Sequence, residues 1–172
     1  MKKNFVLIPL VILLFSCAST KYAGTAACTG RVCGPRGEPV ANYQVSFGLG
    51  LTTVTGSNGM FLIPEMRSGT YTLTGRGAGW ASVEKEISFV DRRSIVCVQV
   101  EPISAVYQRV ESLLKSGLYE EAKTMLKREK SSNDKTELFQ FYQKVVDYCQ
   151  SPSERKKEKL SEYVKEEYGH AL

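Results

Sequence analysis

Few side chains in this 172-residue sequence have the types and spacing that catalysis requires. The single histidine, His170, lies two residues from the C-terminus, where chains tend to be disordered, so acid–base or zinc chemistry built on histidine is not expected. No serine occupies the centre of a G-x-S-x-G elbow. Glu84 and Glu86 share one face of an expected strand, and alternation places that face in water. We therefore expect a protein that is not an enzyme and that holds no cofactor or metal.

Cysteines are the other reactive side chains. Apart from Cys17, considered below, Cys28, Cys33, Cys97 and Cys149 allow three complete pairings. Cys28 and Cys33 lie about 16 Å apart in an extended strand, whereas a disulfide needs Cα atoms within about 7 Å, so these two should not pair. Cys149 lies on an apolar helical stripe, which favours a buried free thiol. No C-x-x-C spacing indicates metal or redox chemistry.

The charge pattern argues against a nucleic-acid partner. The sequence has 23 Lys and Arg against 18 Asp and Glu, and the basic residues are dispersed. The densest basic run, residues 155–159, is interleaved with acidic residues and is typical of a solvated helix face. The glycine-rich segment 75–79 lacks the spacing of a dinucleotide-binding loop and connects two expected strands instead.

The N-terminus has the layout of an export signal. Lys2 and Lys3 precede an apolar run from Phe5 to Phe15. This run is too short for a helix across a bilayer, which needs roughly 20 residues, but it matches the apolar region of a secretory signal peptide. We expect residues 1–16 to be removed on export.

The end of this signal, LLFSC, resembles a bacterial lipobox. Leu14 and the small Ser16 precede Cys17, although Phe15 replaces the usual small residue. The resemblance implies acylation of Cys17, so that membrane lipid holds the mature chain without a spanning segment. Ala18 after the cysteine favours the outer membrane, with the outer face of the inner membrane as the alternative. An ordinary secretory signal with an incidental cysteine is the competing interpretation.

The composition changes near Pro102 and divides the mature chain. Residues 17–26 form a tether, and most of the 14 glycines lie in the half that follows, residues 27–101. This half consists of short runs rich in Val, Ile, Thr, Tyr and Phe between turn residues, which predicts strands with one buried face. Seven strands are expected, at 27–33, 40–47, 51–55, 60–63, 70–75, 80–89 and 94–100. They predict a small β-sandwich.

Four segments of this half resemble, in order, the carboxypeptidase regulatory-like domain: GRV at 30–32, GEPVANYQV at 37–45, SNGMFLI at 57–63 and SGTYTL at 68–73. The resemblance covers residues 28–100. It implies an all-β, seven-stranded, transthyretin-like sandwich without peptidase chemistry, which serves as a structural or binding module. Gly59 after Asn58 should take a positive φ in a hairpin turn. Phe61, Tyr71 and Leu73 should fill one core.

The same resemblance suggests a disulfide. In transthyretin-like sandwiches the first and last strands are neighbours. If Val32 and Val96 face the core, the alternation of side chains along a strand places Cys33 and Cys97 on the outer face. A Cys33–Cys97 disulfide is therefore the pairing we expect.

Residues 103–169 have apolar residues at helical spacing and predict an all-α region of about four helices forming hairpins. Capping boxes are expected at Asp134 with Glu137 and at Ser151 with Glu154. The fourth helix should end at Gly169.

The first of these hairpins, LLKSGLYEEAKTML, resembles a tetratricopeptide repeat, with Gly117 at the turn, then Tyr119 and Ala122. The next pair departs from this pattern, so the resemblance implies one clear repeat and one degenerate repeat; helical hairpins without repeat ancestry are the alternative. Because repeats usually need about three units for stability, the helices should dock on the sandwich, another copy or a partner.

Aromatic side chains are the candidate contact residues. Tyr107, Tyr119 and Phe139 are expected anchors for an envelope protein partner, with Tyr142 a weaker candidate because internal packing is favoured there. Trp80 follows a glycine-rich loop and could stack on a glycan, although a core position is favoured. We therefore expect a membrane-anchored, non-enzymatic interaction or structural module of the bacterial cell envelope. A carbohydrate-binding lipoprotein that uses the sandwich is the alternative.

Overall fold

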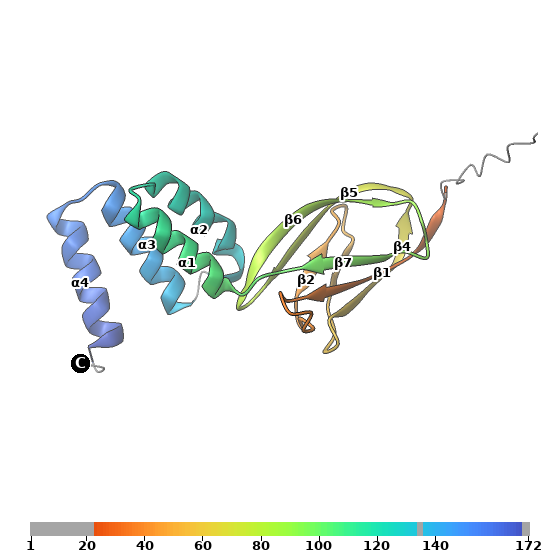
Figure 1. Cartoon of the computed structure of the whole chain (residues 1–172), viewed down its shortest axis with the longest axis horizontal. Helices are drawn as coiled ribbons and strands as arrows, with labels where there is room; N and C mark the ends of the chain where they lie inside the picture. Colours follow the sequence, from red (N-terminus) through yellow and green to blue (C-terminus); the bar gives the residue numbers. More distant parts are fainter. Residues whose placement is uncertain (1–22, 134–135, 170–172) are drawn as a thin grey trace, which may run out of the picture.

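The computed structural model describes residues 23–133 and 136–169. Within them the chain forms seven strands and then four helices, so the expected elements are confirmed (Figure 1). The strands are β1 (Thr25–Cys33), β2 (Gln44–Ser46), β3 (Thr52–Val54), β4 (Met60–Arg67), β5 (Gly69–Gly77), β6 (Trp80–Phe89) and β7 (Ile95–Gln99). The helices are α1 (Ile103–Lys115), α2 (Tyr119–Asn133), α3 (Glu137–Gln150) and α4 (Glu154–Tyr168).

The strands form two sheets around one core, which gives a β-sandwich-like domain. The order is β4-β1-β7 in the three-stranded sheet and β3-β2-β5-β6 in the four-stranded sheet. Alternation along β1 buries Cys28 and Val32 and leaves Arg31 exposed, which is the pattern of a sheet with one wet face. Phe61 and Leu73 are buried in the core, and Tyr71 packs against it half-buried, as expected.

Two turns lie within the segments that resemble the carboxypeptidase regulatory-like domain, and each has a residue with a positive φ. Gly59 has φ +74°, and the amide oxygen of Asn58 accepts a hydrogen bond from the Met60 backbone N–H at 3.0 Å, which confirms the expected hairpin turn. Asn42 also adopts a positive φ, of 56°, a conformation that asparagine tolerates better than most residues. This backbone turn directs Tyr43 into the core.

Tyr43 is fully buried at the helix-proximal end of the sandwich. Its hydroxyl donates to the carbonyl oxygen of Ala81 at 2.8 Å. A Cβ atom at Gly75 would lie 2.5 Å from the Tyr43 ring, so glycine is needed there for the ring to pack. Burial raises the pKa of Tyr43 above its usual value, and the charge of Glu129 raises it further.

The helices pack in chain order. α1 contacts α2, α2 contacts α3, and α3 contacts α4. A second core lies among α1, α2 and α3, and one sandwich residue, Ala81, belongs to it. Helix α4 is joined to α3 by the Tyr163 hydroxyl, which donates to the Glu137 carbonyl oxygen at 2.8 Å.

Both predicted capping boxes are wrong, whereas α4 does end at Gly169 as expected. Thr136, not Asp134, is the residue before α3, and Asp134 itself is outside the described residues. Ser153, not Ser151, caps α4, because its hydroxyl accepts from the Lys156 backbone N–H. Several residues before each helix can serve as its N-cap, and sequence patterns place a helix start only to within one or two residues.

The chain enters and leaves the sandwich at opposite ends. β1 and β7 are parallel, with Thr29 opposite Ile95 and Cys33 opposite Gln99. β1 therefore begins at the end of the sandwich far from the helices, and β7 ends beside α1 (Figure 1).

Candidate functional site

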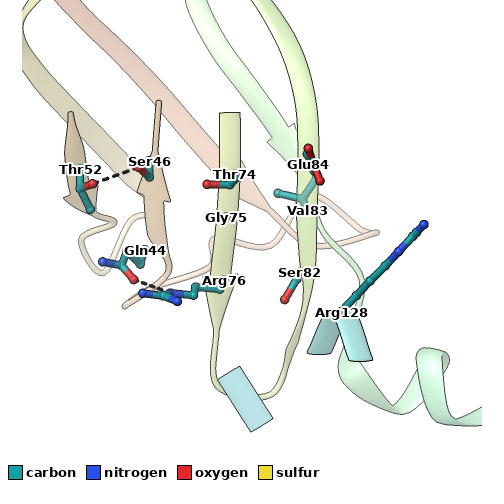
Figure 2. A pocket seen from close by; sticks show the side chains of 10 residues that line it. All are labelled: Gln44, Ser46, Thr52, Thr74, Gly75, Arg76, Ser82, Val83, Glu84 and Arg128. Atoms are coloured by element: carbon teal, nitrogen blue, oxygen red, sulfur yellow. Dashed lines mark hydrogen bonds between the residues drawn. The ribbon is translucent and has the colours of Figure 1, made fainter. Parts of the chain in front are cut away.

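A polar hollow with a volume of about 800 Å³ lies on the outer face of the four-stranded sheet. One row of side chains crosses all four strands, because Thr52 pairs with Ser46, Ser46 with Thr74, and Thr74 with Glu84. A second row holds Gln44 opposite Arg76, with Ser82 on the neighbouring strand (Figure 2). These residues come from the solvent-facing side of each strand, because successive side chains of a strand point to opposite faces of the sheet.

Hydrogen bonds between neighbouring strands fix several of these side chains. The Arg76 guanidinium donates through Nε to the Gln44 amide oxygen at 2.6 Å. The Thr52 hydroxyl donates to the Ser46 hydroxyl at 3.0 Å (Figure 2). The Arg76–Gln44 bond holds the second row in place and leaves the terminal guanidinium nitrogens of Arg76 for a ligand, and the Thr52–Ser46 bond fixes one end of the first row.

Arg128 of α2 also lines the hollow, on the far side of β6 from Gln44 and Arg76 (Figure 2). Among the described residues, Glu84 is the one carboxylate of the lining, which includes no histidine, cysteine or lysine. The arrangement offers hydrogen-bond donors and acceptors rather than a nucleophile beside a base. It suits the binding of a polar ligand. No cluster of three or more metal-ligating side chains occurs in residues 23–133 and 136–169.

Beside the hollow, a buried carboxylate joins the helices to the sandwich. Glu129 of α2 is buried and accepts a hydrogen bond from the Ser82 backbone N–H at 2.8 Å. One turn later, the buried Asn133 accepts from the Gly79 backbone N–H at 3.4 Å. Burial raises the pKa of Glu129, and the Ser82 hydrogen bond lowers it in part. Together Glu129 and Asn133 hold α2 to the β5–β6 turn.

An ion pair lies at the same junction, between α1 and the end of the sandwich. The Arg109 guanidinium of α1 donates to both carboxylate oxygens of Glu101, one of them at 2.8 Å. The hydrogen bond from Arg109 lowers the pKa of Glu101. Both side chains are more than one-third exposed, so the pair contributes little to stability.

Three of the four aromatic residues expected to bind a partner lie inside the helical core. Phe139 is 0 % exposed, and Tyr107 stacks on Tyr142 with ring centroids 4.8 Å apart. Tyr142 also donates its hydroxyl to the Glu111 carboxylate. The prediction that Tyr107 and Phe139 anchor a partner is wrong, because packing among α1, α2 and α3 covers them.

Tyr119 differs from the other three. It begins α2, is half-buried, and lines a small hollow with Leu118, Glu120, Glu121 and Gln150. Lys123 and Glu120 both hydrogen-bond to Gln150, so α3 supports this surface. Of the aromatic residues proposed from the sequence for a protein contact, Tyr119 is the one that the structure leaves partly accessible.

Trp80 packs against the sandwich core while remaining half-buried. It forms a β-bridge with Pro102, and its ring closely approaches Gly34. It does not line the polar hollow. The core position weighed from the sequence therefore describes Trp80 better than a sugar-stacking platform does.

The expected Cys33–Cys97 disulfide is absent. Cys28, Cys33, Cys97 and Cys149 are free cysteines in the structure. Strands β1 and β7 are neighbours, as expected, but Cys33 pairs in register with Gln99 rather than with Cys97. This offset of two residues separates the thiols along the strands.

Residues 1–22, including Cys17, and the terminal His170 lie outside the described residues. In the part of the chain that the structure describes, none of the helices has both the length and the apolar character to span a bilayer.

Sequence reasoning did not identify Gln44, Arg76 or Arg128 as site residues. The alternation of polar and apolar residues along β5 could have indicated an exposed polar face there. The position of Arg128 beside that face depends on how α2 docks and has no local sequence signal.

The model of the carboxypeptidase regulatory-like domain matches residues 27–100. None of the curated proteins matches the sequence. Solved structures resemble less than half of the chain, and only in outline. A chain of a type II cohesin–X-dockerin complex from Acetivibrio cellulolyticus shares 20 % identity at a TM-score of 0.35, over 45 % of this chain and 58 % of that one.

The Bacillus anthracis TIE protein shares 15 % identity at a TM-score of 0.39, over 46 % of this chain and 17 % of that one. A streptococcal ancillary pilin shares 13 % identity at a TM-score of 0.38, over 46 % of this chain and 30 % of that one. Similarity at this level carries no information about partners or activity. The match to the carboxypeptidase regulatory-like domain is confined to residues 27–100, the segment that holds strands β1 to β7.

Proposed function

We propose that this protein is a lipid-anchored, non-enzymatic interaction module of the bacterial cell envelope. In this proposal residues 27–101 form one domain, a transthyretin-like sandwich that acts as a spacer. Residues 103–169 form a second, tetratricopeptide-like domain that meets a protein partner. The chain-order packing of α1 to α4 supports the repeat assignment, since repeat units contact their neighbours.

The distance between the two ends of the sandwich supports this proposal. The parallel pairing of β1 and β7 separates the start of β1 from the start of α1 by the length of the sandwich. Strand β1 alone, at about 3.3 Å per residue, accounts for roughly 27 Å of this length. A membrane anchor on the N-terminal side would therefore place the helices away from the lipid surface, where another envelope protein can reach them.

The anchor itself is proposed from LLFSC at the end of the short apolar run. Acylated Cys17 would attach the mature chain to the outer membrane or to the outer face of the inner membrane. Radioactive palmitate should label the wild-type protein and should not label Cys17→Ala, which should also leave the membrane fraction. A mutant that keeps both the label and its membrane location would show that this anchor is wrong.

The partner surface is tested separately, in cells that carry the anchored protein. Deletion of residues 103–172 should abolish cross-links to neighbouring envelope proteins. Tyr119→Ala should weaken them, whereas Tyr148→Ala, a half-buried tyrosine on α3, serves as the matched control. Full retention of the cross-links by the deletion variant would assign the binding role to the sandwich.

A second function is favoured by the polar hollow. Hydroxyl, amide and guanidinium groups on one open face are groups that hydrogen-bond to carbohydrate. In this alternative the sandwich binds a glycan through Gln44 and Arg76 rather than through Trp80. Calorimetric titration of the mature chain with cell-wall glycan fragments should give binding that Arg76→Ala removes and Arg36→Ala leaves unchanged. Absence of binding to all fragments would exclude this function for those glycans.

A further inference from the structure

The loops of the sandwich divide between its two ends, and one end has an unusual surface. β5 starts where β4 ends, and β2 runs antiparallel to β5. The β2–β3 loop, the β4–β5 turn and the β6–β7 loop therefore all open toward the end at which β1 begins. The Ser68 backbone N–H donates to the Gly24 carbonyl oxygen at 2.8 Å, which places the β4–β5 turn directly beside the incoming chain.

Leu49, at the tip of the β2–β3 loop, is presented to solvent at a conformational cost. Its side chain is 96 % exposed, the largest value among the exposed large hydrophobic side chains of the described residues. Its φ is +49°, a left-handed conformation that non-glycine residues rarely adopt, and the glycines on both sides share this region. Neither solubility nor backbone stability favours leucine here, so the residue points to a contact that the chain itself does not supply.

Three arginines lie at the same end of the sandwich. Arg67 ends β4 opposite Thr25, and Arg92 and Arg93 lie in the β6–β7 loop, which also holds Val90, 36 % exposed. All three guanidiniums are exposed, and none makes an ion pair with another described residue.

Two carboxylates lie near these arginines. Asp91 is turned into its own loop, where it accepts from the Arg93 backbone N–H at 2.9 Å. Glu65 is exposed on β4, two residues before Arg67. The three arginines outnumber these two carboxylates, and positive charge therefore prevails at this end.

We propose that this end of the sandwich, formed by Leu49, Arg67, Val90, Arg92 and Arg93, contacts an anionic lipid bilayer. The inference rests on the proposed anchor for its orientation. From Cys17 to Gly24 the chain can span at most about 25 Å, which keeps this end close to the surface that holds the lipid. Leu49 inserts among the acyl chains, while the arginines bind lipid phosphates. Because Ser46 pairs with Thr74 rather than with the first residues of β5, the β2–β3 loop is set back, and the sandwich leans on the bilayer obliquely.

The test uses the unacylated chain from Ala18 to Leu172 and vesicle flotation. Vesicles of phosphatidylglycerol with phosphatidylcholine are compared with vesicles of phosphatidylcholine alone. The wild type should float with the anionic vesicles at low salt and lose binding as salt increases. The double variant R92Q/R93Q should bind about 25-fold more weakly, or about fivefold for each arginine. Leu49→Asn, which is compatible with the positive φ, should bind about tenfold more weakly.

Matched controls lie elsewhere on the surface. Leu62→Asn removes a leucine that is 50 % exposed on the outer face of the three-stranded sheet, and R36Q/R155Q removes two exposed arginines away from this end. Both should bind as the wild type does. Equal losses in the controls, or no flotation of the wild type, would overturn the proposal. Self-association that Leu49→Asn abolishes would instead assign Leu49 to a second copy. Acylation of Cys17 is measured independently, so failure of the anchor and failure of this contact are distinguishable.

Discussion

The sandwich and the helices reach stability in different ways. The sandwich closes two sheets over a core made entirely of its own residues, from Cys28 to Val100. The helical core is smaller and includes Ala81 from β6. In addition, the buried side chains of Glu129 and Asn133 on α2 accept hydrogen bonds from the backbone at the β5–β6 turn. We therefore expect the sandwich to hold its fold by itself and the helices to depend on their contacts with it.

Separation of the sandwich from the helices should have the largest effect. Residues 23–101 alone should keep a cooperative unfolding transition, because they retain their whole core. Residues 103–172 alone should lose much of their helicity, because short helical arrays depend on tertiary packing. Far-UV circular dichroism during urea titration measures both. Isolated helices as stable as those in the full chain would contradict the dependence.

Two adjacent residues on α3 differ in burial and should differ in their contribution to the stability of the helices. Phe139 is 0 % exposed and Leu138 is 43 % exposed. Phe139→Ala should lower the free energy of unfolding of the helical region by about 3–5 kcal/mol, whereas Leu138→Ala should cost under about 1 kcal/mol. Chemical denaturation with hydrogen exchange can show which region responds. Similar losses for both variants would mean that the helical core is packed differently.

Within the sandwich, the Tyr43 hydroxyl offers a smaller perturbation. Tyr43→Phe leaves the buried Ala81 carbonyl oxygen without this donor and should cost about 1–3 kcal/mol. Tyr119→Phe, at a half-buried position, is the control and should be near neutral. Because Ala81 belongs to the helical core, the loss should extend to both regions. An effect confined to the sandwich would argue against coupling through Ala81.

The smallest effect concerns pH. The pKa of Glu129 is raised in the folded state, so folding binds a proton between the usual glutamate pKa and the raised one. The stabilising contribution is fully present below the usual pKa and is lost as pH rises through the raised one. Glu129→Gln should flatten the stability profile over this window, and the exposed Glu121→Gln should not. Glu101, with its lowered pKa, should show the opposite slope.

The strands were predictable because their signals are local. Alternation along residues 70–75 and the Asn58–Gly59 turn each specify their structure within a few residues. The predicted partner surface failed for Tyr107 and Phe139, since helical spacing reveals an apolar stripe but not whether a partner or a neighbouring helix covers it. The polar hollow was not predictable either, because its lining combines Gln44 and Arg76 of the sheet with Arg128 of α2.

In the proposed function the helices, held away from the anchored end, carry the partner contact. Photo-cross-linking of the anchored protein in its own membranes tests it most directly, with the reactive residue placed at Tyr119 or at Gln44 in the polar hollow. We expect a discrete adduct with an envelope protein from position 119 and none from position 44. An adduct from position 44 alone would instead make the sandwich the binding surface.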